Sequence, residues 1–171
     1  MRLKNHSLVR TQWRSPLGRL DIANSNQGLV GVWFEGAAHR PDMSIWPFVC
    51  TPVHRLAIEQ LDAYFAGRIN RFRLPLDLSL GTPFQQSVWQ ALLELPYGHT
   101  LSYSALSLRL GRQGAVRAVA NAIAHNPLSI IVPCHRVIGA DGRLTGYAAG
   151  LERKAALLRL EGSLPSLRPS A

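Results

Sequence analysis

Residues 82–125 read TPFQQSVWQALLELPYGHTLSYSALSLRLGRQGAVRAVANAIAH, and this stretch decides the class of the second half of the chain. Thr82, Pro83 and Gln85 provide a helix N-cap, a proline at the first helical position and a glutamine three residues after the cap. The apolar residues that follow fall at i, i+4 and i+8 on one helical face: Phe84, Val88 and Leu92. The pattern predicts a helix from residue 83 that LPYGHT, at residues 95–100, breaks.

The same stretch predicts two shorter helices across a turn that contains glycine. Ser102 can cap a helix over residues 103–110, and AVRAVANAIAH at residues 115–125 forms the next helix. Such a pair is typical of the helix-turn-helix of DNA-binding proteins, although many other helical hairpins share it. Alanines leave the second helix slim, with Arg117 and Asn121 as its main polar side chains. This composition suits either close packing on another helix or insertion against a duplex.

The pattern of the first eighty residues predicts an architecture different from that of the helical second half. Short, partly alternating runs at residues 7–13, 19–24 and 29–35 are separated by turn signals and predict a small antiparallel meander. A loop rich in proline and tryptophan follows, and then a helix that begins at Pro52 and ends before Gly67. This part of the chain is therefore predicted to be an α/β unit.

The irregular pattern of residues 69–81 marks the predicted domain boundary. A last helix is predicted over residues 151–160, and little beyond it can pack. We therefore predict an α/β N-terminal domain over residues 1–80, a mainly α C-terminal domain over residues 81–162 and a mobile tail over residues 163–171.

The charge of the chain points toward an anionic partner. It has 19 Lys and Arg against 10 Asp and Glu, a formal net charge of +9. Basic proteins of this size tend to meet polyanions, most often nucleic acid, although such a charge can equally serve solubility. No apolar run approaches the roughly 20 residues of a membrane span, and the basic N-terminus lacks the apolar region of a secretory signal. We expect no membrane partner and a cytoplasmic protein with two free thiols, Cys50 and Cys134.

Residues 130–138, IIVPCHRVI, place a thiol, an imidazole and a guanidinium side by side among aliphatic residues. A cysteine in such a setting is most often an inert small hydrophobe. A neighbouring imidazole or cation can instead favour the thiolate and make the cysteine a nucleophile. Pro133 interrupts the strand, so that Cys134 and His135 can both face inward, and Glu161 is a candidate to orient the imidazole.

Metal binding is the competing use of cysteine and histidine. Zinc sites usually show paired ligands at short spacing. Here Cys50 precedes His54 by four residues and Cys134 adjoins His135, but neither has a second pair in register. The sequence indicates no metal site.

Three segments together resemble the 6-O-alkylguanine-DNA alkyltransferases, the methylated-DNA–protein-cysteine methyltransferases, in their single-function Ogt-like form. The segments are residues 82–112, 117–154 and 157–162, and they include an Asn-Pro pair eight residues before the cysteine of PCHRV. The first 80 residues agree in plan only, best at LDAYFAG, residues 61–67. The resemblance implies a ribonuclease-H-like domain followed by a winged-helix-like domain with a helix-turn-helix.

The resemblance also implies a suicide DNA repair reaction without a cofactor. Cys134 matches the acceptor that takes the alkyl group from guanine and keeps it, and His135 and Glu161 match the pair that deprotonates this thiol through a water. Asn126 matches the asparagine that braces the active-site loop. Tyr103 matches the tyrosine whose hydroxyl assists the departing base. The implied partner is double-stranded DNA with alkylated guanine, bound by a monomer, and alkylated thymine stays open as a second lesion.

The implied contacts with DNA lie mainly on the slim helix. Arg117 matches the arginine that enters the duplex and occupies the space of the extruded nucleotide. Further predicted DNA-binding residues are Ala115, Ala118, Asn121 and Tyr103. Predicted residues of the lesion pocket are Tyr147, Ala148 and Pro133.

The chain departs from the family pattern at His125, at the turn of residues 112–114 and after Lys154, none of them in the predicted catalytic set. Two other functions stay open on the residues alone. One is a helix-turn-helix protein that senses lesions with an inactive thiol. The other is a Cys–His–Glu hydrolase, although no glycine motif of an oxyanion hole flanks the cysteine.

Overall fold

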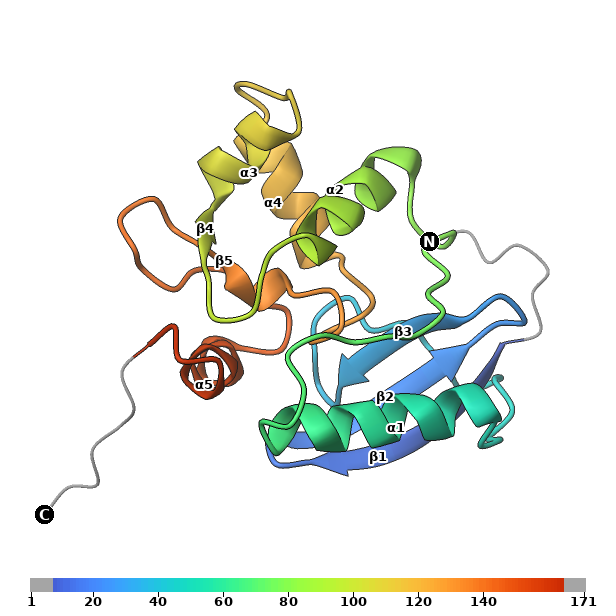
Figure 1. The fold of residues 1–171 in the computed structure, drawn as a ribbon. Helices are drawn as coiled ribbons and strands as arrows, with labels where there is room; N and C mark the ends of the chain where they lie inside the picture. Colours follow the sequence, from blue (N-terminus) through green and yellow to red (C-terminus); the bar gives the residue numbers. More distant parts are fainter. Residues whose placement is uncertain (1–7, 165–171) are drawn as a thin grey trace, which may run out of the picture.

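The first half of the chain forms the predicted meander and helix. The computed structural model describes residues 8–164. Its three-stranded antiparallel sheet has the order β1 (Val9–Ser15), β2 (Gly18–Asn24) and β3 (Leu29–Phe34), with α1 (Pro52–Phe65) packed against it (Figure 1). The Thr51 side chain caps α1 by accepting from His54 N, and the His54 ring completes the capping box from its position three residues on.

Both faces of the sheet are covered at β3, so that every residue of this strand is buried, whereas β1 keeps two exposed residues. Leu61 and Tyr64 of α1 cover one face. Met43 and Trp46, from the loop between β3 and α1, cover the other face beside Trp33. The loop rich in proline and tryptophan is therefore a second covering layer.

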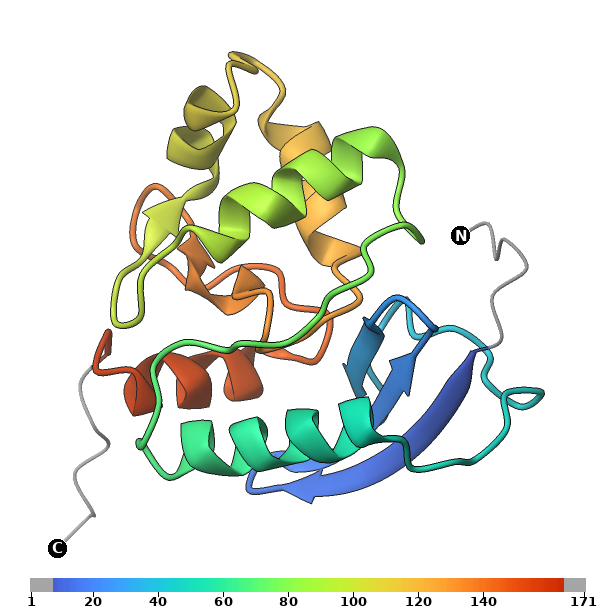
Figure 2. The ribbon, with the colours of Figure 1, turned by 45° about the vertical axis from the view of Figure 1, so that its right-hand side comes forward.

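The second half is mainly helical, as predicted. Its elements are α2 (Pro83–Leu93), β4 (Leu101–Ser102), α3 (Tyr103–Arg109), α4 (Val116–Ala124), the 3₁₀ turn η1 (Cys134–Arg136), β5 (Val137–Ile138) and α5 (Leu151–Leu160) (Figure 2). Thr82 and Gln85 form the predicted capping box, and the Ser102 hydroxyl accepts from Ala105 N at the start of α3. Helices α3 and α4 pack together as the predicted helix-turn-helix. The parallel pairing of β4 with β5 was not predicted.

The two halves share one hydrophobic core. Val32 N of β3 donates to Pro127 O at 2.8 Å, and Ser129 N donates back to Val32 O at 2.9 Å. The segment that leads to Cys134 is therefore attached to the edge of the N-terminal sheet. The division at residues 80 and 81 stays a prediction. Residues 165–171 of the predicted tail lie outside the described residues.

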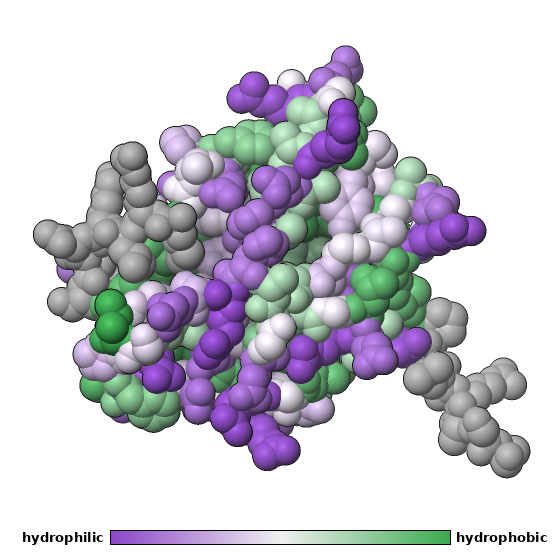
Figure 3. All heavy atoms as spheres, turned by 180° about the vertical axis from the view of Figure 1, so that it is seen from behind, coloured by the Kyte–Doolittle hydropathy of each residue, from purple (hydrophilic) through white to green (hydrophobic). Residues whose placement is uncertain are grey.

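The surface of the described part is mixed in character. Seen from behind, hydrophilic residues form a band across the molecule and hydrophobic residues gather in separate patches (Figure 3). Within residues 8–164, every helix is too short or too polar to cross a bilayer.

Candidate active site

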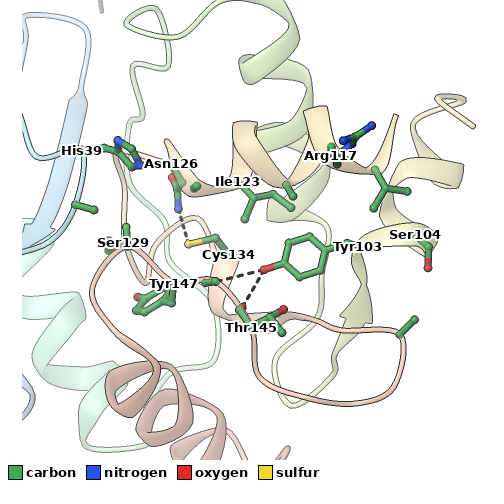
Figure 4. A pocket seen from close by; sticks show the side chains of 17 residues that line it. His39, Tyr103, Ser104, Arg117, Ile123, Asn126, Ser129, Cys134, Thr145 and Tyr147 are labelled. Carbon is green, nitrogen blue, oxygen red and sulfur yellow. Dashed lines mark hydrogen bonds between the residues drawn. The ribbon is translucent and has the colours of Figure 1, made fainter. Parts of the chain in front are cut away.

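A pocket of about 610 Å³ brings six of the predicted site residues together. Its lining includes Cys134, Asn126, Tyr103, Arg117, Tyr147 and Ala148. They come from η1, the two ends of α4, the start of α3 and the loop before α5. Figure 4 shows Cys134 between Asn126 and the Tyr103 ring, with Tyr147 below. Residues more than 40 positions apart in sequence thus converge on one thiol.

Asn126 holds the cysteine loop in place. Its Nδ2 donates to Val132 O at 2.9 Å and to Cys134 Sγ at 3.0 Å, and its Oδ1 accepts from Leu128 N at 3.0 Å. One buried amide therefore fixes both ends of the turn and touches the thiol. Ile130 has a φ of 73° within this turn, a conformation that a β-branched residue adopts only when its surroundings impose it.

The Cys134 thiol is buried and favours its protonated form. Burial raises its pKa above the usual value, while the hydrogen bond from Asn126 and the positive charge of Lys154 act in the opposite direction. Such a thiol needs a base before it can act as a nucleophile. Among the described residues 8–164, neither nitrogen of the His135 ring is hydrogen-bonded to the Cys134 thiol.

His135 is oriented to serve as that base. Its Nε2 donates to Glu161 Oε1 at 2.8 Å, and neither side chain is exposed. Nδ1 is buried without a hydrogen-bond partner among the described residues, so it is the ring nitrogen that can accept a proton. Burial lowers the pKa of His135 and outweighs the neighbouring carboxylate, which raises this pKa. The lowered pKa keeps the ring neutral.

Glu161 is the centre of a buried network that the sequence only partly revealed. Arg136 donates to both carboxylate oxygens, through Nε at 2.8 Å and Nη2 at 2.9 Å. Tyr64 of α1 donates its hydroxyl to Oε1 at 2.7 Å. Burial alone would raise the pKa of Glu161, but the hydrogen bonds from His135 and Arg136 outweigh it and lower the pKa to about 2. Tyr64 gave no signal in the sequence because 97 residues separate it from its partner.

Acid should weaken the fold through Glu161. Because the folded pKa lies near 2, below the ordinary value of 4.5, the unfolded chain binds more protons in this range. The contribution is present above pH 4.5 and is lost as the pH falls toward 2, on the order of 3 kcal/mol in total. Urea unfolding between pH 7 and 3 should show a smaller loss of stability for Glu161→Gln than for the parent. Glu152→Gln, at an exposed carboxylate of α5, should follow the parent, and parallel curves for all three proteins would contradict the assignment.

Lys154 was not predicted as a site residue, yet it is completely buried beside the pocket. Its ammonium donates to the carbonyls of Val137, Thr145 and Gly146. Burial lowers its pKa to about 8. The Tyr103 hydroxyl donates to the same Thr145 O at 3.0 Å, and burial raises the pKa of this phenol, which keeps it a donor. Lys154 and Tyr103 therefore fix one pocket loop together.

The predicted DNA-binding residues lie on the outer side of α4 and at its start. Arg117, Ala118 and Asn121 are exposed, whereas Ala115 is half-buried. Arg117 also lines the mouth of the pocket, so one side chain adjoins both the surface and the cavity. Pro133, predicted for the lesion pocket, instead lines a second pocket of about 590 Å³ beside Arg136.

The residues that the structure describes contain no group of three His, Cys, Asp or Glu side chains that could hold a metal ion. Cys50, the other cysteine, is exposed and far from this arrangement in sequence.

Comparison with known proteins places the chain in a family. The model of the 6-O-methylguanine DNA methyltransferase ribonuclease-like domain matches residues 8–78, and that of the DNA binding domain matches residues 83–163. The methylated-DNA–protein-cysteine methyltransferase of Mycobacterium tuberculosis is 48% identical over 152 residues, which cover 87% of this chain and 89% of that protein. Its counterpart from Methanosarcina barkeri is 44% identical and covers 86% and 92%.

A solved structure agrees with these sequences. The crystal structure of Mycobacterium tuberculosis OGT in complex with DNA superimposes with a TM-score of 0.83 at 46% identity, over 90% of this chain and 92% of that one. Both halves of the chain and their order are thus matched. The chain belongs to the 6-O-methylguanine DNA methyltransferase family.

Proposed function

We propose that this protein repairs alkylated guanine in double-stranded DNA by transferring the alkyl group irreversibly to Cys134. The observation that carries the assignment is a buried thiol in a pocket, braced by Asn126, next to a neutral histidine that a buried carboxylate orients. Its relatives are named for the same transfer to a protein cysteine. The protein is thus a methyltransferase that is consumed by its own reaction.

The first step is removal of the thiol proton. His135 Nδ1 takes the proton from Cys134, through a bridging water, and Glu161 stabilises the resulting imidazolium through Nε2. Arg136 and Tyr64 hold the carboxylate in position. Burial makes the resting thiol unreactive, so the nucleophile forms only inside this arrangement.

The second step is displacement at the alkyl carbon. The Sγ–C bond forms while the bond from that carbon to the guanine oxygen breaks, and the proton that left the thiol ends on the restored guanine. Charge that develops on this oxygen needs a donor, and Tyr103 supplies it when its hydroxyl turns from Thr145 O toward the base. The thioether that remains has no easy hydrolysis, so each molecule acts once.

The target atom lies inside a stacked duplex, so the nucleotide must be extruded at a cost of a few kcal/mol. The exposed face of α4 suits this task, because Ala118 lets the helix approach closely and Arg117 can fill the space left behind. We expect a monomer to act on the duplex in the cytoplasm, with alkylated thymine as a second lesion to be tested.

The direct test is incubation with a duplex that carries a single 6-O-methylguanine, followed by mass spectrometry of the peptides. The mass of one methyl group should appear on the peptide with Cys134, with one transfer per protein molecule. Tight binding without a mass shift would favour lesion sensing, and repeated turnover on an ester would favour a hydrolase.

Arg117→Ala should slow repair of a lesion in duplex DNA by about tenfold or more, because the extruded state loses a contact worth at least about 1.4 kcal/mol. Reaction with the free alkylated base, which needs no extrusion, should be nearly unchanged. Single-turnover rates on both substrates measure this difference. Arg68→Ala removes an exposed charge from the other half of the chain and controls for net charge. Equal losses on both substrates would reject the extrusion role.

A further inference from the structure

Tyr64 is a phenol of the first half of the chain that reaches the acceptor site in the second half. It lies in the last turn of α1, which Figure 2 shows beside the end of α5. Its side chain is completely buried, and its hydroxyl donates to Glu161 Oε1 at 2.7 Å. The rings of Phe65, Phe72 and Tyr97 pack against the Tyr64 ring, with centroids at 5.5, 5.3 and 6.1 Å. This packing fixes where the hydroxyl points.

Three donors share the Oε1 oxygen of Glu161. Besides the Tyr64 hydroxyl, it accepts from His135 Nε2 at 2.8 Å and from Arg136 Nη2 at 2.9 Å. The other oxygen, Oε2, accepts from Arg136 Nε at 2.8 Å. Each hydrogen bond draws negative charge toward its donor, so donors that share one oxygen weaken one another. The Tyr64 hydroxyl therefore reduces the negative charge that Oε1 presents to the imidazole.

That negative charge decides how strongly His135 holds a proton. When the ring becomes an imidazolium, its Nε2–H group faces Oε1, and a more negative oxygen stabilises the cation more. Burial lowers the pKa of His135, the carboxylate raises it, and the charges of Arg136 and Lys154 lower it further. Tyr64 weakens the contribution of the carboxylate. A ring that held its proton too firmly would already be an imidazolium at neutral pH and could not accept the proton of Cys134.

Two further phenols lie near Glu161, and neither replaces Tyr64. Tyr97, after α2, and Tyr147, before α5, interact electrostatically with the carboxylate, and burial raises the pKa of both, so both stay neutral at pH 7. The Tyr97 hydroxyl instead donates to Leu160 O at 3.0 Å. Among the tyrosines that the structure describes, Tyr64 is therefore the one that is hydrogen-bonded to this carboxylate.

We propose that Tyr64 is a positioning residue of the alkyl transfer, which keeps His135 available as a base by sharing the Glu161 oxygen that the imidazole faces. The proposal rests on the proposed function, because His135 is the base of that reaction. Tyr64 does not line the pocket of Cys134 and acts through Glu161. The first half of the chain thereby adjusts the pH range in which the second half reacts.

Tyr64→Phe is the sharpest test, because it removes the hydroxyl and keeps the ring that packs at the end of α1. Glu161 retains its hydrogen bonds from His135 and Arg136. The first readout is the NMR resonance of the His135 Nε2 proton at pH 7, which should move downfield because its hydrogen bond to Oε1 strengthens. The second readout is the pH at which the single-turnover rate on duplex with 6-O-methylguanine is half-maximal. It should rise by about half a unit or more, because the imidazole gives up its proton less readily.

Tyr97→Phe is the matched control, because it removes a neighbouring phenol hydroxyl that donates to Leu160 O and not to Glu161. Both readouts should equal those of the parent. If either readout of Tyr64→Phe stayed at the parent value, or if the two variants changed them equally, the proposal would be overturned. A rate lowered by the same factor at every pH would then indicate that the hydroxyl serves packing alone.

The resonance is measured without DNA, which separates this proposal from the proposed function. A parent protein that transferred no methyl group to Cys134 would refute the proposed function. Normal transfer by the parent, together with an unmoved resonance in Tyr64→Phe, would refute the role of Tyr64 alone.

Discussion

Cys134→Ala should take up no alkyl group from DNA that carries 6-O-methylguanine, while binding of that DNA remains within a factor of about three of the parent, or about 0.6 kcal/mol. The reaction is lost completely because the residues that line the pocket include no second thiol. Binding is retained because the exposed face of α4, with Arg117 and Asn121, is untouched. Transfer of a radiolabelled methyl group and gel-shift titration measure the two properties separately.

The chain offers a natural control for this experiment, since it has two cysteines. Cys50→Ala should transfer one methyl group per molecule, as the parent does, because Cys50 is exposed and outside the pocket lining. Uptake of the label by Cys134→Ala, or loss of uptake in Cys50→Ala, would show that Cys134 is not the acceptor.

His135→Gln should lower the rate of transfer at neutral pH by about 10²- to 10⁴-fold, the usual contribution of a general base. The glutamine amide can still donate to Glu161, so the pairing of Glu161 with Arg136 is preserved. What disappears is the titratable Nδ1. The thiol then loses its proton only to solvent, and burial raises its pKa. The variant's rate should therefore climb about tenfold per pH unit below that pKa.

His54→Gln is the matched control, because His54 is also fully buried but belongs to the cap of α1. Glutamine is a common partner in that capping box, so the fold should tolerate it. Its rate should equal that of the parent. If the rate of transfer by His135→Gln were low and did not rise with pH, His135 would have a structural role and would not act as the base.

The sequence predicted the local elements well, since their signals are local. The Thr82–Gln85 capping box fixes the start of α2 within four residues, and Ser102 does the same for α3. The predicted ends of the helices were less exact. The predicted helix at 115–125 became α4 (Val116–Ala124), because Ala115 has a ψ of 21° and starts the helix without a side-chain cap.

The site was predictable only where a motif carried it. Cys134 and His135 stand together in one motif, and Glu161 was a candidate partner on the residues alone. The family resemblance supplied the roles of Asn126, Tyr103 and Arg117. The β4–β5 pair is two residues long and left no periodic pattern to detect. Pro133, adjacent to the cysteine in sequence, faces the second pocket instead.

The sequence by itself determined the family, the order of the two halves, the helix-turn-helix and the identity of the candidate acceptor. Only the tertiary structure decided what surrounds the thiol. Tyr64 reaches Glu161 from 97 residues away, Lys154 is buried where a helical lysine is ordinarily exposed, and His39 comes from the first half to stack on His125. These contacts arise when the segment before Cys134 docks on β3, and docking between distant segments leaves no local pattern in the chain.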